Sequence, residues 1–160
     1  MPNWCMNELE IYAYDNEEQF NDFINKVRDT ENGSELSLEK LLPTPLELLA
    51  LKSPNTSSTP DECSELILKY GHTDWYEWRL ENWGTKWDVD ANLTSEGDSY
   101  RLYKFESAWT PPTKWIATVA RMFPDVRFKL KYDEPGMCFM GVCLAHGENF
   151  YDDWIDYSFL

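Results

Sequence analysis

The stretch CMNELEIYA at residues 5–13 decides the fold, because its side chains alternate with a period of two. The odd positions are mostly apolar, whereas the even positions Glu8 and Glu10 are charged. Such alternation is typical of a β-strand with one face against a core. The sequence therefore predicts a strand at the start of the chain.

A helix is expected directly after this strand. Its apolar side chains follow i, i+3, i+4, i+7 spacing, which predicts one core-facing stripe: Phe20, Phe23, Ile24 and Val27. Asp15, with Glu18 three residues later, resembles a capping box, so the helix is expected to begin there.

Regular patterns return after residue 86. Alternation from Trp87 to Leu93, a turn at residues 95–98 and a return strand predict a hairpin over residues 87–106. Residues 110–123 begin with Thr-Pro-Pro and carry a second apolar stripe, which predicts a helix. Strands are expected over residues 126–132 and 139–145, and residues 150–159 could add another.

The order strand, helix, strand, strand, helix, strand is the split βαβ, or ferredoxin-like, arrangement. We therefore expect a single α+β domain over residues 1–160, with an antiparallel sheet and two packing helices. A helical insertion is expected at about residues 34–86, and one or two extra strands at the C-terminal end.

This topology makes the first and fourth strands antiparallel neighbours. We expect three basic side chains of the fourth strand to face Glu8 and Glu10 across the sheet: Arg127, Lys129 and Lys131. Opposite charges on neighbouring strands are mildly stabilising. This interpretation is favoured over an anion site.

The net charge is the strongest compositional signal. Twenty-nine acidic residues against fourteen basic ones leave −15, and no Lys or Arg lies before Lys26 or after Lys131. Such a surface repels phosphate backbones and attracts basic surfaces. The simpler explanation of this charge is that it keeps the protein soluble. The more specific explanation is that the acidic surface imitates a nucleic acid.

No apolar run is long enough to cross a membrane, and the first residues lack the features of a secretion signal. We therefore expect a soluble, cytoplasmic protein with reduced cysteines. The spacings of its Cys and His residues match no zinc site, so we expect no metal and no cofactor.

Residues 83–88, with sequence WGTKWD, form a candidate ligand turn. Glycine, a hydroxyl and a lysine could bind phosphate, and nearby rings could stack on a base. The candidate binding residues are Trp83, Thr85, Lys86, Trp87, Asp88 and Trp109. The favoured alternative is structural: a glycine that ends a helix, tryptophans in the core and a lysine paired with an acid.

Carboxylates near the C-terminal end form a second candidate site, an acidic face. Its predicted members are Asp133, Glu134, Glu148, Asp152, Asp153 and Asp156. Among 29 acids such neighbours arise by chance, and adjacent strand residues face opposite ways. Solvated surface is therefore the simpler explanation, and no catalytic residue is predicted.

The opening MPNWCxN resembles the YubB-type ferredoxin-like domain family, small proteins carried by phages and plasmids. The segments LPTP at residues 42–45, NWGTKWD at 82–88, AWTPP at 108–112 and EPG at 134–136 continue the resemblance. Ala13 departs from it, since a glycine is expected there. The resemblance implies the fold and a mobile-element origin, but no catalytic residues.

The leading hypothesis is a non-enzymatic acidic binding protein of a phage or plasmid. Its expected partner is a basic or nucleic-acid-binding host protein, with an anti-defence or nucleic-acid-mimic role. The alternative is a nucleotide- or small-ligand-binding module, or an enzyme, that uses the turn at residues 83–88. A third hypothesis, direct binding of single-stranded nucleic acid by the sheet, is opposed by the charge.

Overall fold

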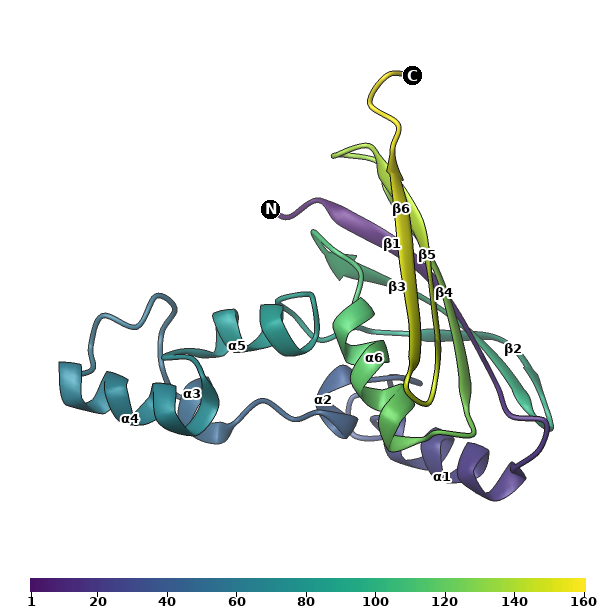
Figure 1. Cartoon of the computed structure of the whole chain (residues 1–160), viewed down its shortest axis with the longest axis horizontal. Coiled ribbons are helices and arrows are strands. Elements are labelled where there is room, and N and C mark those ends of the chain that lie inside the picture. Colours follow the sequence, from purple (N-terminus) through teal and green to yellow (C-terminus); the bar gives the residue numbers. More distant parts are fainter.

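A computed structural model describes residues 1–160 as one six-stranded antiparallel sheet with helices on one side (Figure 1). The strand order is β2-β3-β1-β4-β5-β6. The strands are β1 (Trp4–Tyr12), β2 (Asn92–Gly97), β3 (Tyr100–Ala108), β4 (Arg127–Glu134), β5 (Phe139–His146) and β6 (Asn149–Asp156). The helices are α1 (Glu17–Val27), α2 (Leu38–Leu41), α3 (Leu46–Leu49), α4 (Pro60–Tyr70), α5 (Trp75–Asn82) and α6 (Thr113–Met122).

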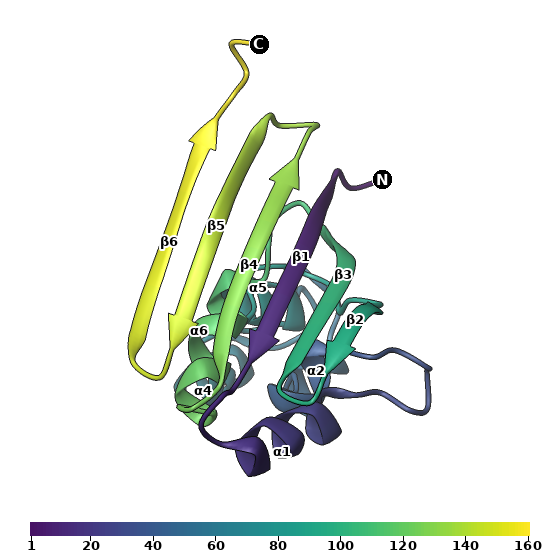
Figure 2. The same cartoon turned by 90° about the vertical axis from the view of Figure 1, so that its right-hand side faces the viewer.

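Strand β1 lies between β3 and β4 and is antiparallel to both. This is the ferredoxin-like arrangement, so the predicted fold is confirmed. The predicted pairing is present for two of the three basic residues, because Glu8 lies opposite Lys131 and Glu10 lies opposite Lys129, whereas Arg127 lies opposite Tyr12. Figure 2 looks at the other face of this sheet, which no helix covers.

The core lies between the sheet and the helices α1 and α6. Every second residue of β1 is buried, and so is the predicted apolar stripe of α1. Phe23 makes edge-to-face contacts with Phe123 and Phe128, at centroid distances of 5.3 and 5.4 Å. Each such side chain contributes roughly 1.5–3 kcal/mol through burial, so this layer fixes which face of the sheet is open.

The insertion at residues 34–86 contains α2 to α5. A capping box starts α4, because Thr59 and Glu62 bond each other's main-chain N–H groups, and Gly71 ends it at φ 79°. Asp74 caps α5. Figure 1 shows α3 and α4 extending away from the sheet, on the side of the helices.

Two local predictions were wrong. Helix α1 is capped by Asn16, whose side chain accepts from the Gln19 N–H, and not by Asp15. Strand β2 begins at Asn92 rather than at residue 87, and the hairpin turn follows Gly97. Residues 87–91, which the sequence placed in this strand, lie beside the segment that leads into α2. There the Ala91 N–H donates to the Ser34 hydroxyl, and the Ala91 carbonyl accepts from the Glu35 N–H.

Both extra C-terminal strands are present. Strand β5 pairs with β4, and β6 pairs with β5 and forms the edge of the sheet. All eight residues of β6 are exposed. No helix in the structure combines the length and the apolar character that a membrane span requires.

Candidate functional site

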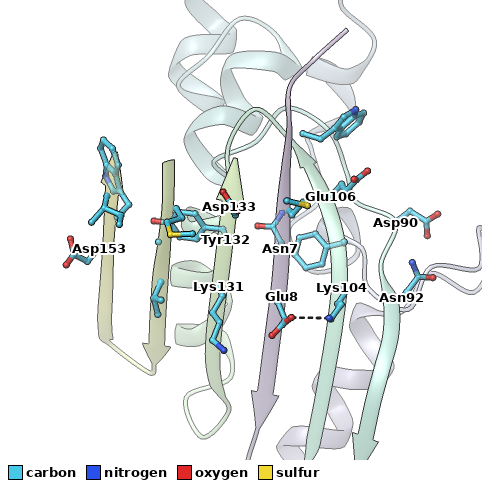
Figure 3. A pocket seen from close by; sticks show the side chains of 18 of the residues that line it. Asn7, Glu8, Asp90, Asn92, Lys104, Glu106, Lys131, Tyr132, Asp133 and Asp153 are labelled. Carbon is cyan, nitrogen blue, oxygen red and sulfur yellow. Dashed lines mark ion pairs between the residues drawn. The ribbon is translucent and has the colours of Figure 1, made fainter. Parts of the chain in front are cut away.

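The open face of the sheet is hollowed. The sheet hollow has a volume of about 1230 Å³ and is lined by residues of all six strands and of the segment before β2. Figure 3 shows its polar side chains, which come from strands far apart in the sequence. The hollow is positioned by β1 and its two neighbours, whose core-facing residues lie on the opposite side.

Acidic side chains dominate the lining. Six carboxylates line the sheet hollow, and the basic side chains there are two lysines: Glu8, Asp88, Asp90, Glu106, Asp133 and Asp153 against Lys104 and Lys131. Six negative charges against two positive ones leave an excess of four negative charges. The hollow is therefore anionic in its own right, beyond the charge of the whole chain.

Ion pairing neutralises little of this charge. Lys104 Nζ lies 3.2 Å from Glu8 Oε2, whereas Lys131 makes no ion pair within 4.0 Å. Glu106 and Asp90 likewise have no cationic side chain within that distance. Farther along the same face, Lys129 pairs with Glu10 at 3.0 Å, and this hydrogen bond raises the pKa of the lysine.

Large apolar side chains share the open face with these charges. Trp4, Met6, Met140 and Ile155 all line the sheet hollow and are exposed, Ile155 by more than half. The ring centroid of Trp4 lies 6.1 Å from that of Trp87, so a second exposed indole lies next to the Trp4 side of the hollow. Exposed large apolar side chains grouped in a hollow support an interaction site in a folded protein.

The candidate ligand turn places its first residues inside the protein. Trp83 is fully buried and its Nε1–H donates to the Leu42 carbonyl at 2.9 Å. Thr85 is also buried, and its hydroxyl donates to the Ala108 carbonyl at 2.9 Å. Gly84 ends helix α5 at φ 88°. These groups hold the insertion against the end of β3.

The remaining members of that turn point elsewhere. Lys86 Nζ lies 4.2 Å from the ring centroid of Trp87, so this lysine stacks on an indole instead of pairing with an acid. Asp88 accepts from the Leu38 N–H and from the Ser37 hydroxyl, both at 2.6 Å, and thereby starts α2. Trp109 is partly exposed, with φ 70°. The six residues do not converge on one ligand-sized site.

The predicted acidic face is divided between several places. Asp133 and Asp153 line the sheet hollow. Asp152 and Asp156 lie on the opposite face, because their partners across the strand pair are Cys143 and Phe139. The other two members are at neither place: Glu134 is buried, and Glu148 lies in the turn between β5 and β6.

Neutral hydrogen-bond donors, not cations, hold several of these carboxylates. The Tyr157 hydroxyl donates to Asp133 at 2.6 Å, which raises the pKa of Tyr157 to about 12. The Tyr132 hydroxyl donates to Asp152 at 2.7 Å; burial and this bond raise the pKa of Tyr132. Glu134 instead closes the β4–β5 turn by accepting from two main-chain N–H groups.

Sequence reasoning missed half of the carboxylates in the sheet hollow. Glu106 could have been found from strand register, since it lies opposite Met6 on the open face. Asp90 had no such signal, because it belongs to an irregular segment whose course depends on contacts with α2. Asp88 was predicted as part of the ligand turn, whereas the structure places it in the lining of the sheet hollow.

The cysteines lie apart from this surface. All four are free thiols, and burial raises the pKa of Cys5 and of Cys143 to about 12. Both therefore stay protonated at neutral pH. No three His, Cys, Asp or Glu side chains form a cluster that could hold a metal ion.

Comparisons with known proteins agree with this fold. Residues 82–159 match the sequence model of a family described as the ferredoxin-like domain in Api92-like protein. The whole fold is similar to the crystal structure of the protein api92 from Yersinia pseudotuberculosis, with a TM-score of 0.52 and 10% identity over 99% of each chain. No curated protein matches the sequence. The likeness extends to the architecture of the entire chain.

Proposed function

We propose that this chain is a non-enzymatic binding protein whose sheet hollow holds a basic surface of another protein. The observation that carries the proposal is the excess of six carboxylates over two lysines in a hollow that also exposes large apolar side chains. Complementary charge steers association and sets specificity, while buried apolar side chains supply most of the binding energy.

The chemistry of the hollow favours a protein partner over a nucleic acid. Ferredoxin-like sheets that bind RNA combine stacking rings with a positive surface. Here rings are present, but the neighbouring charges would repel phosphates. Lysine and arginine side chains suit both features, because their charged ends pair with carboxylates and their stems pack on rings.

The partner we propose is a nucleic-acid-binding protein of a host cell, met in the cytoplasm. Such proteins carry clustered lysines and arginines that neutralise phosphates, so an anionic hollow could occupy the same cluster. The resemblance to small phage- and plasmid-carried proteins motivates the finer proposal of an anti-defence or nucleic-acid-mimic inhibitor. The turn at residues 83–88 supports no second candidate, because its buried groups already bond to the protein.

The test is capture from bacterial lysate on the immobilised full chain, with bound proteins quantified by mass spectrometry. A hollow variant carries Asp90→Asn, Glu106→Gln and Asp133→Asn. A control variant carries Glu17→Gln, Glu65→Gln and Asp98→Asn, three exposed acids outside the hollow. Both variants lose the same three negative charges, so only the position of the charge differs.

We expect the wild-type chain and the control variant to retain the same basic, nucleic-acid-binding protein. The hollow variant should lose it, with affinity for the purified partner reduced by about tenfold or more. Binding should also weaken steeply in 1 M salt, where the screening length falls to about 3 Å. Equal capture by the two variants, or capture without any basic protein, would contradict the proposal.

A further inference from the structure

Strand β6 is an unprotected sheet edge. It pairs with β5 along eight residues without a register shift and has no neighbour on its other side. Its sequence NFYDDWID contains no lysine, no proline and no bulge, and the charges that keep other strands off this edge are three aspartates, which a basic strand would neutralise. Its free main-chain N–H and C=O groups therefore form a ready template for another strand.

Both faces of β6 expose large apolar side chains. Phe150 and Trp154 lie on the face shared with the core, and Tyr151 and Ile155 lie on the open face. No helix covers β6, as Figure 2 shows, and the Trp154 ring has one aromatic neighbour, Phe139, at 6.1 Å. An added strand would cover these four side chains from the side.

Charge selects the kind of strand that fits. Asp152, Asp153 and Asp156 place carboxylates on both faces of β6, and none of them forms an ion pair. Opposite charges on neighbouring strands are favourable, and like charges directly opposite each other are unfavourable. Asp153 also lines the sheet hollow, so the edge continues the surface already described.

We infer that β6 receives an antiparallel strand from the basic partner, which extends the sheet to seven strands. This inference rests on the proposed function, because it names how the same partner is held. The incoming strand carries two adjacent basic residues opposite Asp152 and Asp153, with apolar residues beside Trp154 and Ile155. Main-chain hydrogen bonds supply affinity and the alternate side chains supply specificity.

A second copy of this chain is a poor occupant of the edge. Two free β6 edges pair antiparallel with the same sheet face up, so the longest registers place Asp152 or Asp153 directly opposite the same residue of the other copy. A like-charge aspartate pair would thus meet at the centre of the interface, between chains that each carry a net charge of −15. The edge is therefore suited to a foreign strand.

The test uses the full chain and the synthetic peptide Lys-Val-Val-Lys-Lys-Val-Val-Thr, whose lysines fall opposite the three aspartates. A second peptide has the same sequence with alternate main-chain nitrogens methylated, which keeps every charge and removes main-chain donors. Binding is measured by calorimetry at low salt, and amide hydrogen exchange locates the site. A sedimentation experiment reports whether the free chain is a monomer.

We expect the unmodified peptide to bind, to slow exchange in β6 and β5, and to bind about tenfold or more tightly than the methylated peptide. Equal affinities, or unchanged exchange in β6, would overturn strand addition. A stable dimer whose β6 amides are protected would overturn it too. None of these outcomes touches the proposed function, which fails if the hollow variant captures the basic protein as well as the control variant does, or if no basic protein is captured.

Discussion

Lys104 Nζ on β3 lies 3.2 Å from Glu8 Oε2 on β1, although Glu8 also faces Lys131 of β4 in the strand register. Glu8 thus has a lysine on each side and pairs with one of them (Figure 3). The second lysine remains in the sheet hollow without an ion pair. Its charge opposes binding of a basic partner and contributes little to the fold.

The first prediction concerns this lysine. Lys131→Gln should change the free energy of unfolding by no more than about 0.5 kcal/mol, because an exposed side chain without a partner is lost. It should tighten binding of the lysine–valine peptide, since one positive charge leaves the anionic surface. Urea unfolding and calorimetry measure the two effects.

Lys104→Gln is the matched change. It removes the ion pair with Glu8 and should cost about 0.2–1 kcal/mol, the range of exposed pairs. A stability loss for Lys131→Gln that equals or exceeds the loss for Lys104→Gln would show that Lys131, too, has a structural role.

The second prediction separates the two tryptophans of the turn. Trp83→Ala should destabilise the protein by about 3–5 kcal/mol, because it empties a buried site and leaves the Leu42 carbonyl without its donor. Trp87→Ala should cost about 1 kcal/mol, since that ring is partly exposed. Chemical unfolding of both variants is the measurement, and similar losses would contradict the assignment of the turn to structure.

The sequence predicted the fold wherever one periodicity covered a whole element. Strand β1 and helix α1 are such cases, because burial alternates along the strand and follows the predicted stripe on the helix. Residues 87–91 have the same alternation as a strand but pair with nothing in the sheet, since Asp88 bonds to the first residues of α2. That contact joins positions about fifty residues apart and leaves no local signal.

The candidate site was predictable only in its chemistry. Net charge pointed to an anionic surface, but adjacency in sequence grouped Asp152 with Asp153 although they lie on opposite faces of β6. The carboxylates that do converge come from four strands and the segment before β2. Their meeting depends on strand order and register, which composition does not contain.

The third prediction concerns Gly141, where β5 is crowded by its neighbours. A Cβ at this position would collide with the Tyr132 hydroxyl and would lie 2.5 Å from the Asp153 carbonyl oxygen of β6. Gly141→Ala should therefore push β6 away from β5 and cost about 1–3 kcal/mol. Hydrogen exchange should quicken in β6 and remain unchanged in β1.

Gly97→Ala is the control for this change, because the nearest atom to a Cβ there is Tyr100 Cβ at 3.8 Å, an ordinary contact. If strand addition at β6 is correct, Gly141→Ala should also weaken binding of the lysine–valine peptide, whereas Gly97→Ala should not. Unchanged exchange in β6 would mean that the strand pair absorbs the extra methyl group.

The fourth prediction is loss of stability at alkaline pH. Burial raises the pKa of Cys5 and Cys143 from 9.0 to about 12, and that of Tyr103 from 10.0 to about 12. These groups stay protonated in the folded chain after they have ionised in the unfolded one. Their stabilising contribution is complete below pH 9 and is lost as the pH rises toward 12, by about 1.4 kcal/mol per pH unit for each thiol.

Urea unfolding between pH 8 and pH 11 measures this dependence. Cys143→Ala should lower the free energy of unfolding at pH 8, because it leaves a small cavity. It should also make the decline in that free energy above pH 9 shallower, because one of the two buried thiols no longer contributes. Cys63→Ala is the matched change at a thiol that is only partly buried, and it controls for the loss of a thiol as such. A flat profile from pH 9 to pH 11 would mean that Cys5 and Cys143 ionise as readily in the folded chain as in the unfolded one, which their burial beneath the sheet opposes.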